Sequence, residues 1–466
     1  MRYFSAKFKL TQKPKPMNLK SILSSMLFLL VMSCQVKEDH KINYSEIADQ
    51  MEVSLKGNLL ETWYPKAIDL DSGGYFSNFT HDFQIKDNSQ EKMIVTQARH
   101  LWSNAKAAKR YPEHSHYRDG AKHGFEFLRD KMWDQEHGGF YQLVSRSGKP
   151  LLEKSPLKTA YGNSFAIYSL AAYFGATGDS AGLDLAIKAF MWMEENSHDP
   201  KFKGYFQHLG QDGTPIIRPS DTPSTSDLGY KDQNSSIHLL EALTELYEVW
   251  KDPLLKERLE EMLLLVRDTI TNEKGSLVLF FQPDWTPVSF QDKGEDEIMK
   301  HKNLDHVSYG HDVETAYLIL ESSHVLGWKN DEVTLTKAKK MVDHALDHGW
   351  DNEKAGFFDE GYYFPGEEKP RVIKDSKNWW AQSEGMNTLL LMAELFPDDP
   401  WDYFGKFEAL WLYNQEYLID HEHGDWYSGG LDKQPELKTA DKGHIWKANY
   451  HQFRAMKGCI DRLRSW

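Results

Sequence analysis

The stretch Asp134-Gln135-Glu136-His137-Gly138-Gly139-Phe140-Tyr141 is one copy of a turn that recurs along the chain. Each copy has an aspartate, a few polar residues, a glycine and a closing pair of aromatic residues. The other copies begin at Asp71, Asp199, Asp351 and Asp420, and their first aromatic residues are Tyr75, Tyr205, Phe357 and Trp426. Successive copies are 65, 65, 152 and 69 residues apart, so the long gap is about twice the period. We expect a degenerate copy near Phe280-Phe281, and the spacing then predicts six repeated units.

The segments between the turns have helical periodicity. Apolar residues from Tyr161 to Tyr173 form one broad stripe, which ends at Gly175-Ala176-Thr177-Gly178-Asp179. A second stripe runs from Ile237 to Val249 and ends before Pro253. Each unit therefore contains two helices and a turn that can form a short β-hairpin. An open superhelix also fits this arithmetic, but we expect an all-α, closed barrel of six helical hairpins, because chemically capable residues recur at one end of one helix per unit.

One position in each unit carries the residue on which this expectation rests. At the repeat period these residues are Arg99, Phe165, His238, His311, Glu384 and His451, with steps of 66, 73, 73, 73 and 67 residues. If the inner helices form a ring, these positions converge at one mouth of it. His238 and His311 are each followed three residues later by a glutamate, Glu241 and Glu314, and we expect each carboxylate to orient its imidazole. A single histidine is more often structural, but three in phase with the repeat favour a shared site.

The composition limits the classes of function. The 466 residues include 55 lysines and arginines against 70 aspartates and glutamates, a net charge of −15, so no nucleic-acid partner is expected. Cys34 and Cys459 are too few for a disulfide framework or a zinc cluster. The chain has no GxGxxG, P-loop or HExxH motif, so nucleotide and zinc-protease functions have no support. Aromatic residues make up 13% of the chain and can stack on sugar faces as well as fill a core.

The N-terminal segment predicts the location of the protein. Basic residues precede an apolar run from Ile22 to Met32, which is too short to span a bilayer but suits a signal peptide. The run ends in Val31-Met32-Ser33-Cys34, which resembles the lipobox of bacterial lipoproteins; a buried first helix is the alternative. We therefore expect a signal segment over 1–34, with Met17 as a possible true start, a flexible tether over 35–50, and a single catalytic domain over 51–466. The expected location is the bacterial cell envelope, with the protein held by a lipid on Cys34 in the periplasm or at the outer membrane.

Blocks spread over almost the whole chain resemble one known family. They are Gln97-Ala98-Arg99 with Trp102, Asn234-Ser235-Ser236-Ile237-His238-Leu239-Leu240-Glu241-Ala242, Ser308-Tyr309-Gly310-His311-Asp312-Val313-Glu314, Trp379-Trp380, and Trp446-Lys447 followed by Tyr450-His451. In this order they resemble the N-acylglucosamine 2-epimerase superfamily, in particular its cellobiose 2-epimerase branch. The resemblance implies an (α/α)6 barrel that needs no metal and no organic cofactor.

The resemblance also implies roles for individual residues. His311 and His451 would be the two acid/base residues, and Arg99 and His238 would face the oxygen atoms of the intermediate. The sugar contacts implied are Asn234, Glu314, Trp379 and Trp446, to which we add the neighbouring candidates Trp380, Tyr161 and Glu384. Ser236 stands where cellobiose epimerases usually carry another histidine, and Lys447-Ala448-Asn449 departs from the usual Cys-Pro before the Tyr-His pair. These departures leave the sugar open among cellobiose or mannobiose, free mannose or glucose, and an N-acylated hexosamine.

Epimerisation at C2 explains why such residues would be needed. A reducing sugar opens to its aldehyde, a base removes the C2 proton, and the negative oxygen of the resulting cis-enediolate needs fixed donors such as Arg99 and His238. Protonation of the opposite face requires a second acid/base group, and histidine suits both tasks because its reference pKa is about 6.5. We therefore predict a cofactor-independent isomerase that inverts C2 of a reducing-end aldose of the cellobiose or mannobiose type.

Other functions fit parts of the sequence. If only one histidine is active, aldose–ketose isomerisation is the natural outcome, and an N-acylhexosamine 2-epimerase would share the fold. A glycoside hydrolase or lyase would need two carboxylates about 5–10 Å apart, for which Asp305 or Glu384 could partner Asp312 or Glu314. A non-catalytic lipoprotein that captures glycans would have stacking aromatics without the arginine–histidine set. The expected partner is a reducing mono- or disaccharide, and the expected state is a monomer.

Overall fold

The computed structural model describes residues 43–86, 89–219 and 225–466. Ser45–Trp466 form one compact unit. The lipobox at Cys34 and the signal segment before it lie outside the described residues, so the expectation of a lipid anchor remains a prediction. Among the described residues, no helix is both long and apolar enough to cross a membrane.

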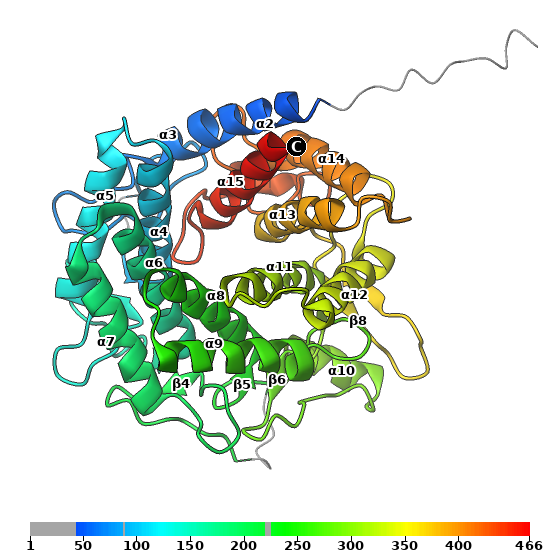
Figure 1. Cartoon of the computed structure of the whole chain (residues 1–466), viewed down its shortest axis with the longest axis horizontal. Coiled ribbons are helices and arrows are strands. Elements are labelled where there is room, and N and C mark those ends of the chain that lie inside the picture. The colour runs from blue at the N-terminus through cyan, green and yellow to red at the C-terminus, as the bar shows by residue number, and fades with distance from the viewer. Residues whose placement is uncertain (1–42, 87–88, 220–224) are drawn as a thin grey trace, which may run out of the picture. The chain divides into compact units, whose positions relative to one another are not determined.

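Six helices of the described unit form an inner ring. They are α4 (Ile94–Arg110), α6 (Ala160–Thr177), α8 (Gln233–Val249), α11 (Tyr309–Val325), α13 (Trp379–Leu395) and α15 (Tyr450–Ser465). Each packs against the next, and α15 packs against α4, which closes the ring. Most of their residues are buried on every side, as expected for helices enclosed by other helices. Figure 1 shows this ring inside a second layer of helices, and the predicted barrel of helical hairpins is confirmed.

The outer layer packs one helix against each inner helix. Its members are α2 (Tyr44–Val53), α5 (Ser115–Phe127), α7 (Ser180–Asn196), α9 (Pro253–Leu265), α12 (Glu332–Gly349) and α14 (Tyr403–Tyr413). Several continue into a π-helical turn, namely η1 (Ser54–Leu60, followed by α3, Glu61–Trp63), η2 (Leu128–Met132), η3 (Val266–Ile270) and η5 (Asn414–Leu418). Short helices lie in the connections, namely α10 (Glu295–His301), η4 (Lys302–Leu304) and η6 (Pro435–Thr439). The N-terminal outer helix reaches α15 through η1, so the first and last parts of the unit close the barrel together.

Most of the short strands pair between neighbouring units, and the last two form a local hairpin, as expected for short β-hairpin loops. The antiparallel pairs are β1 (Lys92–Met93) with β2 (Leu143–Val144), β3 (Lys158–Thr159) with β4 (His208–Leu209), and β5 (Lys231–Asp232) with β6 (Phe280–Phe281). A three-stranded sheet contains β7 (Val307–Ser308), β8 (Glu360–Tyr362) and β9 (Arg371–Lys374) in that order. The first strand of each set directly precedes an inner helix, so this pairing fixes the end of the barrel at which the inner helices begin.

The recurring turns are present with two corrections. Single antiparallel bridges mark six of them in the described chain: Ile68 with Tyr75, Trp133 with Phe140, His198 with Tyr205, Thr271 with Leu277, Trp350 with Phe357, and Ile419 with Trp426. The expected degenerate copy is present at Thr271–Leu277, a few residues before Phe280-Phe281, and that aromatic pair is not part of the turn because it forms β6. In the first copy the equivalent aspartate is Asp69 and not Asp71, because the Asp69 amide donates to the carbonyl of Gly74 as that of Asp134 does to Gly139.

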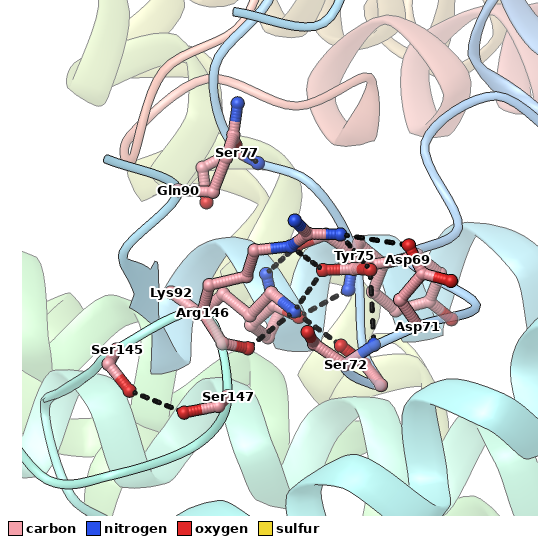
Figure 2. A network of polar contacts seen from close by, with 12 residues as sticks. Asp69, Asp71, Ser72, Tyr75, Ser77, Gln90, Lys92, Ser145, Arg146 and Ser147 are labelled. Atoms are coloured by element: carbon pink, nitrogen blue, oxygen red, sulfur yellow. Dashed lines mark hydrogen bonds and ion pairs between the residues drawn. The ribbon is translucent and has the colours of Figure 1, made fainter. Parts of the chain in front are cut away.

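In most of these turns the aspartate forms an ion pair with a buried lysine that lies just before the next inner helix. Figure 2 shows the first example, in which Lys92 and Arg146 both bind the carboxylate of Asp69, at 2.9 Å and 2.7 Å. Burial alone would raise the pKa of Asp69, but these hydrogen bonds lower it to about 2. The same pairing recurs between Lys158 and Asp134 (2.6 Å), Lys231 and Asp199 (2.8 Å), and Lys377 and Asp351 (2.7 Å). Each of these lysines lies two residues before an inner helix, so the pair holds that helix end in place.

Candidate active site

The recurring residues lie on two levels rather than in the single ring that the spacing predicts. Arg99, Phe165, His238 and Glu384 are each the sixth residue of an inner helix, whereas His311 is the third residue of α11 and His451 the second of α15. The sixth residue of α11 is Glu314 instead, and α15 contributes Arg454, its fifth. The two histidines expected to act as acid and base therefore lie about one helical turn nearer the helix starts than the other residues.

A residue just before its own helix contacts the His311 ring. Its Nδ1 atom lies 2.9 Å from the hydroxyl of Ser308, which directly precedes α11, and its ring centroid lies 4.6 Å from that of Trp380. Burial, together with the other histidines nearby, lowers the pKa of His311 to about 3. The predicted pairing of His311 with Glu314 is wrong, because Glu314 binds Arg454. At the third position of a helix the ring turns back toward the preceding strand end, out of reach of Glu314.

A carboxylate from another inner helix contacts the His451 ring. Its Nδ1 atom lies 2.7 Å from Oε1 of Glu384 on α13 and 4.0 Å from Oε1 of Glu314 on α11. With a carboxylate as the acceptor, Nδ1 carries the proton and Nε2 is left free to accept one. Burial and the charge of Arg99 lower the pKa of His451 well below the usual value. The Trp380 ring lies 6.0 Å from His451 and so stands beside both imidazoles.

Arg99 and His238 lie next to each other on the deeper level. Arg99 donates to the Tyr161 hydroxyl at 3.1 Å and to the Trp446 carbonyl at 3.0 Å, and its guanidinium stacks over Phe165. Its Nε atom is buried without a hydrogen-bond partner. The His238 ring packs on Phe165 with a centroid distance of 4.8 Å, so the Arg99 guanidinium and the His238 imidazole contact the same aromatic ring. Their positions bring two hydrogen-bond donors to the same part of the barrel.

The second predicted histidine–glutamate pair does form. Nδ1 of His238 lies 3.0 Å from Oε2 of Glu241. The other oxygen of Glu241 binds Arg454. Burial alone would raise the pKa of the Glu241 carboxyl, but the charge of Arg454 and the hydrogen bond with His238 outweigh burial and lower this pKa to about 2. An ionised Glu241 fixes the proton of His238 on Nδ1, and its Nε2 atom then faces away from the carboxylate.

The remaining predicted contacts differ in accessibility. Trp446 is 48% exposed, and Asn234, Trp379 and Trp380 are partly exposed, so these side chains are available to a ligand. Glu314 and Glu384 are fully buried behind His451. Their position favours a role in orienting other groups over the direct contact with sugar that the sequence suggested. Tyr161 is 9% exposed and lies between Arg99 and His238, with its ring 5.3 Å from the latter.

Arg454 is the main residue that sequence reasoning missed. Its guanidinium binds Glu241, Glu314 and Glu384, which come from α8, α11 and α13. Its position in the sequence could have pointed to it. Arg454 is the fifth residue of α15, close to the sixth position at which the other inner helices carry their candidate site residues.

Part of this cluster has the residue types that could bind a metal ion. Glu314, Glu384 and His451 bring potential ligand atoms within 4.8 Å of one another. The Arg454 guanidinium already binds both of these carboxylates and supplies positive charge at this point. The residues therefore fit an ion-pair network better than a metal site.

Comparisons with known proteins show which proteins this chain is similar to. A sequence model of the family described as N-acylglucosamine 2-epimerase (GlcNAc 2-epimerase) matches residues 74–455. The cellobiose 2-epimerase of Bacteroides fragilis is 28% identical over 431 residues, covering 90% of this chain and 98% of that protein. The D-mannose isomerase of Marinomonas mediterranea is 25% identical over 419 residues, covering 86% and 94%. The solved structure of cellobiose 2-epimerase from Spirochaeta thermophila superposes with a TM-score of 0.76 at 27% identity, covering 91% of this chain and 98% of that one.

Proposed function

Because this chain belongs to the N-acylglucosamine 2-epimerase family, an enzyme family of carbohydrate epimerases and isomerases, we propose that it inverts C2 of a reducing-end aldose. The resemblance predicted from the sequence is thereby confirmed at the level of the family. We propose a disaccharide of the cellobiose or mannobiose type as the substrate, which the likeness to cellobiose 2-epimerases over nearly the whole chain supports. The observation that carries the reaction type is the meeting of two imidazoles beside one tryptophan ring.

In the proposed reaction the two histidines exchange roles across the sugar. One neutral imidazole takes the C2 proton of the opened aldose, and the electrons of the C–H bond move toward C1, so that its carbonyl oxygen becomes an enediolate oxygen. The other histidine, in its protonated form, gives a proton to the opposite face of C2, which regenerates the aldehyde with inverted configuration. The histidines then exchange protons with solvent before the next turnover.

Different surroundings suit the two histidines to these roles. Glu384 accepts from Nδ1 of His451, so a carboxylate lies where it stabilises His451 as an imidazolium. The neighbour of His311 is the neutral hydroxyl of Ser308, which fixes the ring without favouring its charged form. Both side chains can serve as the base when neutral, and the reverse reaction uses them in the opposite order.

The enediolate would be stabilised on the deeper level. Arg99 keeps its positive charge throughout, and its Nε atom has no protein acceptor. His238, oriented by Glu241, offers its Nε2 side to the same region. The inner helices begin at this end of the barrel, so their partly positive N-termini also favour a negative oxygen there.

Exchange of the C2 hydrogen tests this function. The purified protein should be incubated in D2O with a panel of reducing mono- and disaccharides and followed by proton NMR and mass spectrometry. A 2-epimerase gives the epimer with deuterium at C2, whereas an aldose–ketose isomerase gives a ketose. Addition of water with cleavage would indicate a glycoside hydrolase, and an unchanged sugar with all hydrogens retained would indicate a binding protein.

We also propose that the enzyme is a lipid-anchored monomer of the bacterial cell envelope. The support is the apolar run from Ile22 to Met32, which ends in Val31-Met32-Ser33-Cys34, and the polar stretch after it. On this proposal Cys34 is the lipidated residue, and 51–466 form a single catalytic domain that takes its sugar from outside the cytoplasm.

A further inference from the structure

The Arg454 guanidinium lies between three buried carboxylates from three different inner helices. Glu241 binds one terminal nitrogen, and Glu314 and Glu384 bind the other, the latter at 2.7 Å. Nε of Arg454 also donates to Glu384 at 3.2 Å. The arginine is 6% exposed and the carboxylates are 3%, 1% and 0% exposed. Buried charges of this kind persist only when paired, so each carboxylate depends on this one cation.

Two of these carboxylates reach the imidazoles of the site. Glu384 lies 2.7 Å from Nδ1 of His451, and Glu241 lies 3.0 Å from Nδ1 of His238. In both cases the carboxylate stands between the arginine and the imidazole. Arg454 therefore connects a histidine on α15 with a histidine on α8 through two ion pairs, although it touches neither ring.

We propose that Arg454 is a positioning residue for the epimerase reaction: by keeping Glu384 and Glu241 ionised, it fixes His451 and His238 in the tautomer whose Nε2 atom faces the sugar. This inference rests on the proposed function for its catalytic consequence, but its electrostatic part concerns the protein alone. The fixed tautomer follows because an ionised carboxylate can only accept, so the imidazole must donate from Nδ1.

The charge balance explains why this arginine is needed. Three carboxylates in one buried cluster repel one another, and Arg454 is the cation that all three contact. Burial raises the pKa of Glu384 even with the arginine present, and the charge of Glu241 adds to this rise while Arg454 opposes it. Without Arg454, we expect Glu384 to take up a proton at neutral pH. A protonated Glu384 no longer stabilises His451 as an imidazolium.

Other groups that face Glu384 do not replace Arg454. From the neighbouring helices these are His238 and Glu241 on α8, Glu314 on α11, and Tyr450, His451 and Cys459 on α15; burial keeps the pKa of the Tyr450 hydroxyl well above its usual range, so it supplies no positive charge. Two of them are carboxylates, and Cys459 is a buried thiol whose pKa is raised by burial to about 12. The histidines are the groups to be oriented.

The first test measures steady-state kinetics of Arg454→Met and Arg454→Lys between about pH 5 and pH 9. We expect Arg454→Met to lower kcat about 100-fold at neutral pH while KM changes less than about threefold, because no substrate contact is lost. The acidic limb of the kcat profile should move to higher pH by about one unit or more, because Glu384 must be ionised for activity. Arg454→Lys keeps one charge and should retain intermediate activity. The matched control is Arg464→Met on the same helix, where the arginine is exposed and binds Asp49 and Glu52; its kcat and pH profile should equal those of the wild type.

Charge compensation separates this role from simple support of the fold. The double variant Arg454→Met/Glu314→Gln removes one carboxylate together with the cation, so it should recover at least about tenfold in kcat over Arg454→Met and shift the acidic limb back. Circular dichroism and thermal melting would show whether each variant is folded. An acidic limb that stays in place, a double variant that is no better than Arg454→Met, or a loss expressed only in KM would overturn the proposal.

An infrared measurement tests the electrostatic part without any turnover. Folded Arg454→Met should show more absorbance than the wild type in the C=O stretch of protonated buried carboxyl groups at neutral pH, and Arg454→Met/Glu384→Gln should lose this increase. Burial raises the pKa of Glu321 to about 7, so that residue contributes to the band in all three proteins and the difference from the wild type is the readout. If Arg454→Met does not fold, the same comparison with Arg454→Lys applies. Absence of this increase in the folded variants would overturn the proposal even if the wild type is an active epimerase. A wild type that never exchanges the C2 hydrogen would instead refute the proposed function and leave the infrared result to decide the role of Arg454.

Discussion

Replacing Lys158 with methionine removes one of the buried lysines that fasten a turn to an inner helix. Lys158 Nζ contacts Oδ2 of Asp134 and the carbonyls of Gly138 and Gln211, each at 2.6 Å, and both charged side chains are almost completely buried. Removing one partner of a buried ion pair costs about 3–5 kcal/mol. Asp134 keeps two backbone amide donors on its other oxygen. We therefore expect the lower part of that range, a loss of about 3 kcal/mol in the free energy of unfolding.

Urea unfolding at neutral pH, followed by circular dichroism, measures this loss. The matched control is Lys122→Met, which breaks the exposed ion pair with Glu126 and should change the free energy by less than about 0.5 kcal/mol. Burial would raise the pKa of Asp134, but its hydrogen bond with Lys158 lowers it below the ordinary value. A carboxyl with a lowered pKa stabilises the fold fully above its unfolded pKa, so the difference between wild type and Lys158→Met should shrink as the pH falls below about 4, toward the lowered pKa of Asp134. A loss no larger than that of Lys122→Met would refute the view that these pairs fix the helix ends.

Three further predictions concern the site, the core and the N-terminus. Trp446→Ala should raise KM for the sugar about tenfold and change kcat less than about threefold, because the Trp446 carbonyl accepts from Arg99 and its exposed ring can stack on a sugar; an unchanged KM in initial-rate assays would remove this ring from the site. Burial lowers the pKa of His100 to about 3 in the folded protein, so as the pH falls His100 is protonated in the unfolded protein before it is protonated in the folded one. The free energy of unfolding should therefore decrease by about 2 kcal/mol between pH 7 and pH 5. His100→Gln should flatten the pH dependence of urea unfolding by that amount, and an equal slope in both proteins would contradict the assignment. Cys34→Ala should move the protein from the membrane fraction to the soluble fraction of the producing bacterium, and equal membrane association of both forms would contradict a lipid anchor.

Much of the fold could be predicted because its determinants are local and repeat. The turn around Asp134 and the apolar stripes between turns are visible within single segments. The copy at Thr271–Leu277 was expected a few residues too far along the chain because it lacks the aspartate and the aromatic pair; Asn272 takes the place of the aspartate and accepts from the amide of Gly275. The strand pairs between units were not predicted, since a strand such as Lys92–Met93 pairs with Leu143–Val144, about 50 residues away, and no local pattern encodes that choice.

The site was predictable in its members but not in their pairing. His238 and His311 have the same spacing to a glutamate, yet only His238 binds it. His238 is the sixth residue of its helix, whereas His311 is the third and turns toward Ser308. Glu314 is instead taken by Arg454, which lies 140 residues away in the chain. Competition between partners that only the closed barrel brings together is not visible in a sequence.

The most direct test of the central claim is the fate of the C2 hydrogen in D2O with wild type, His311→Asn and His451→Asn. We predict that the wild type converts a reducing aldose to its C2 epimer with deuterium at C2, because the proton comes from a histidine that has exchanged with solvent. Each variant should remain folded and bind the sugar but form no epimer. Undiminished epimer formation by both variants, or an epimer that retains its original C2 hydrogen, would contradict the two-histidine account.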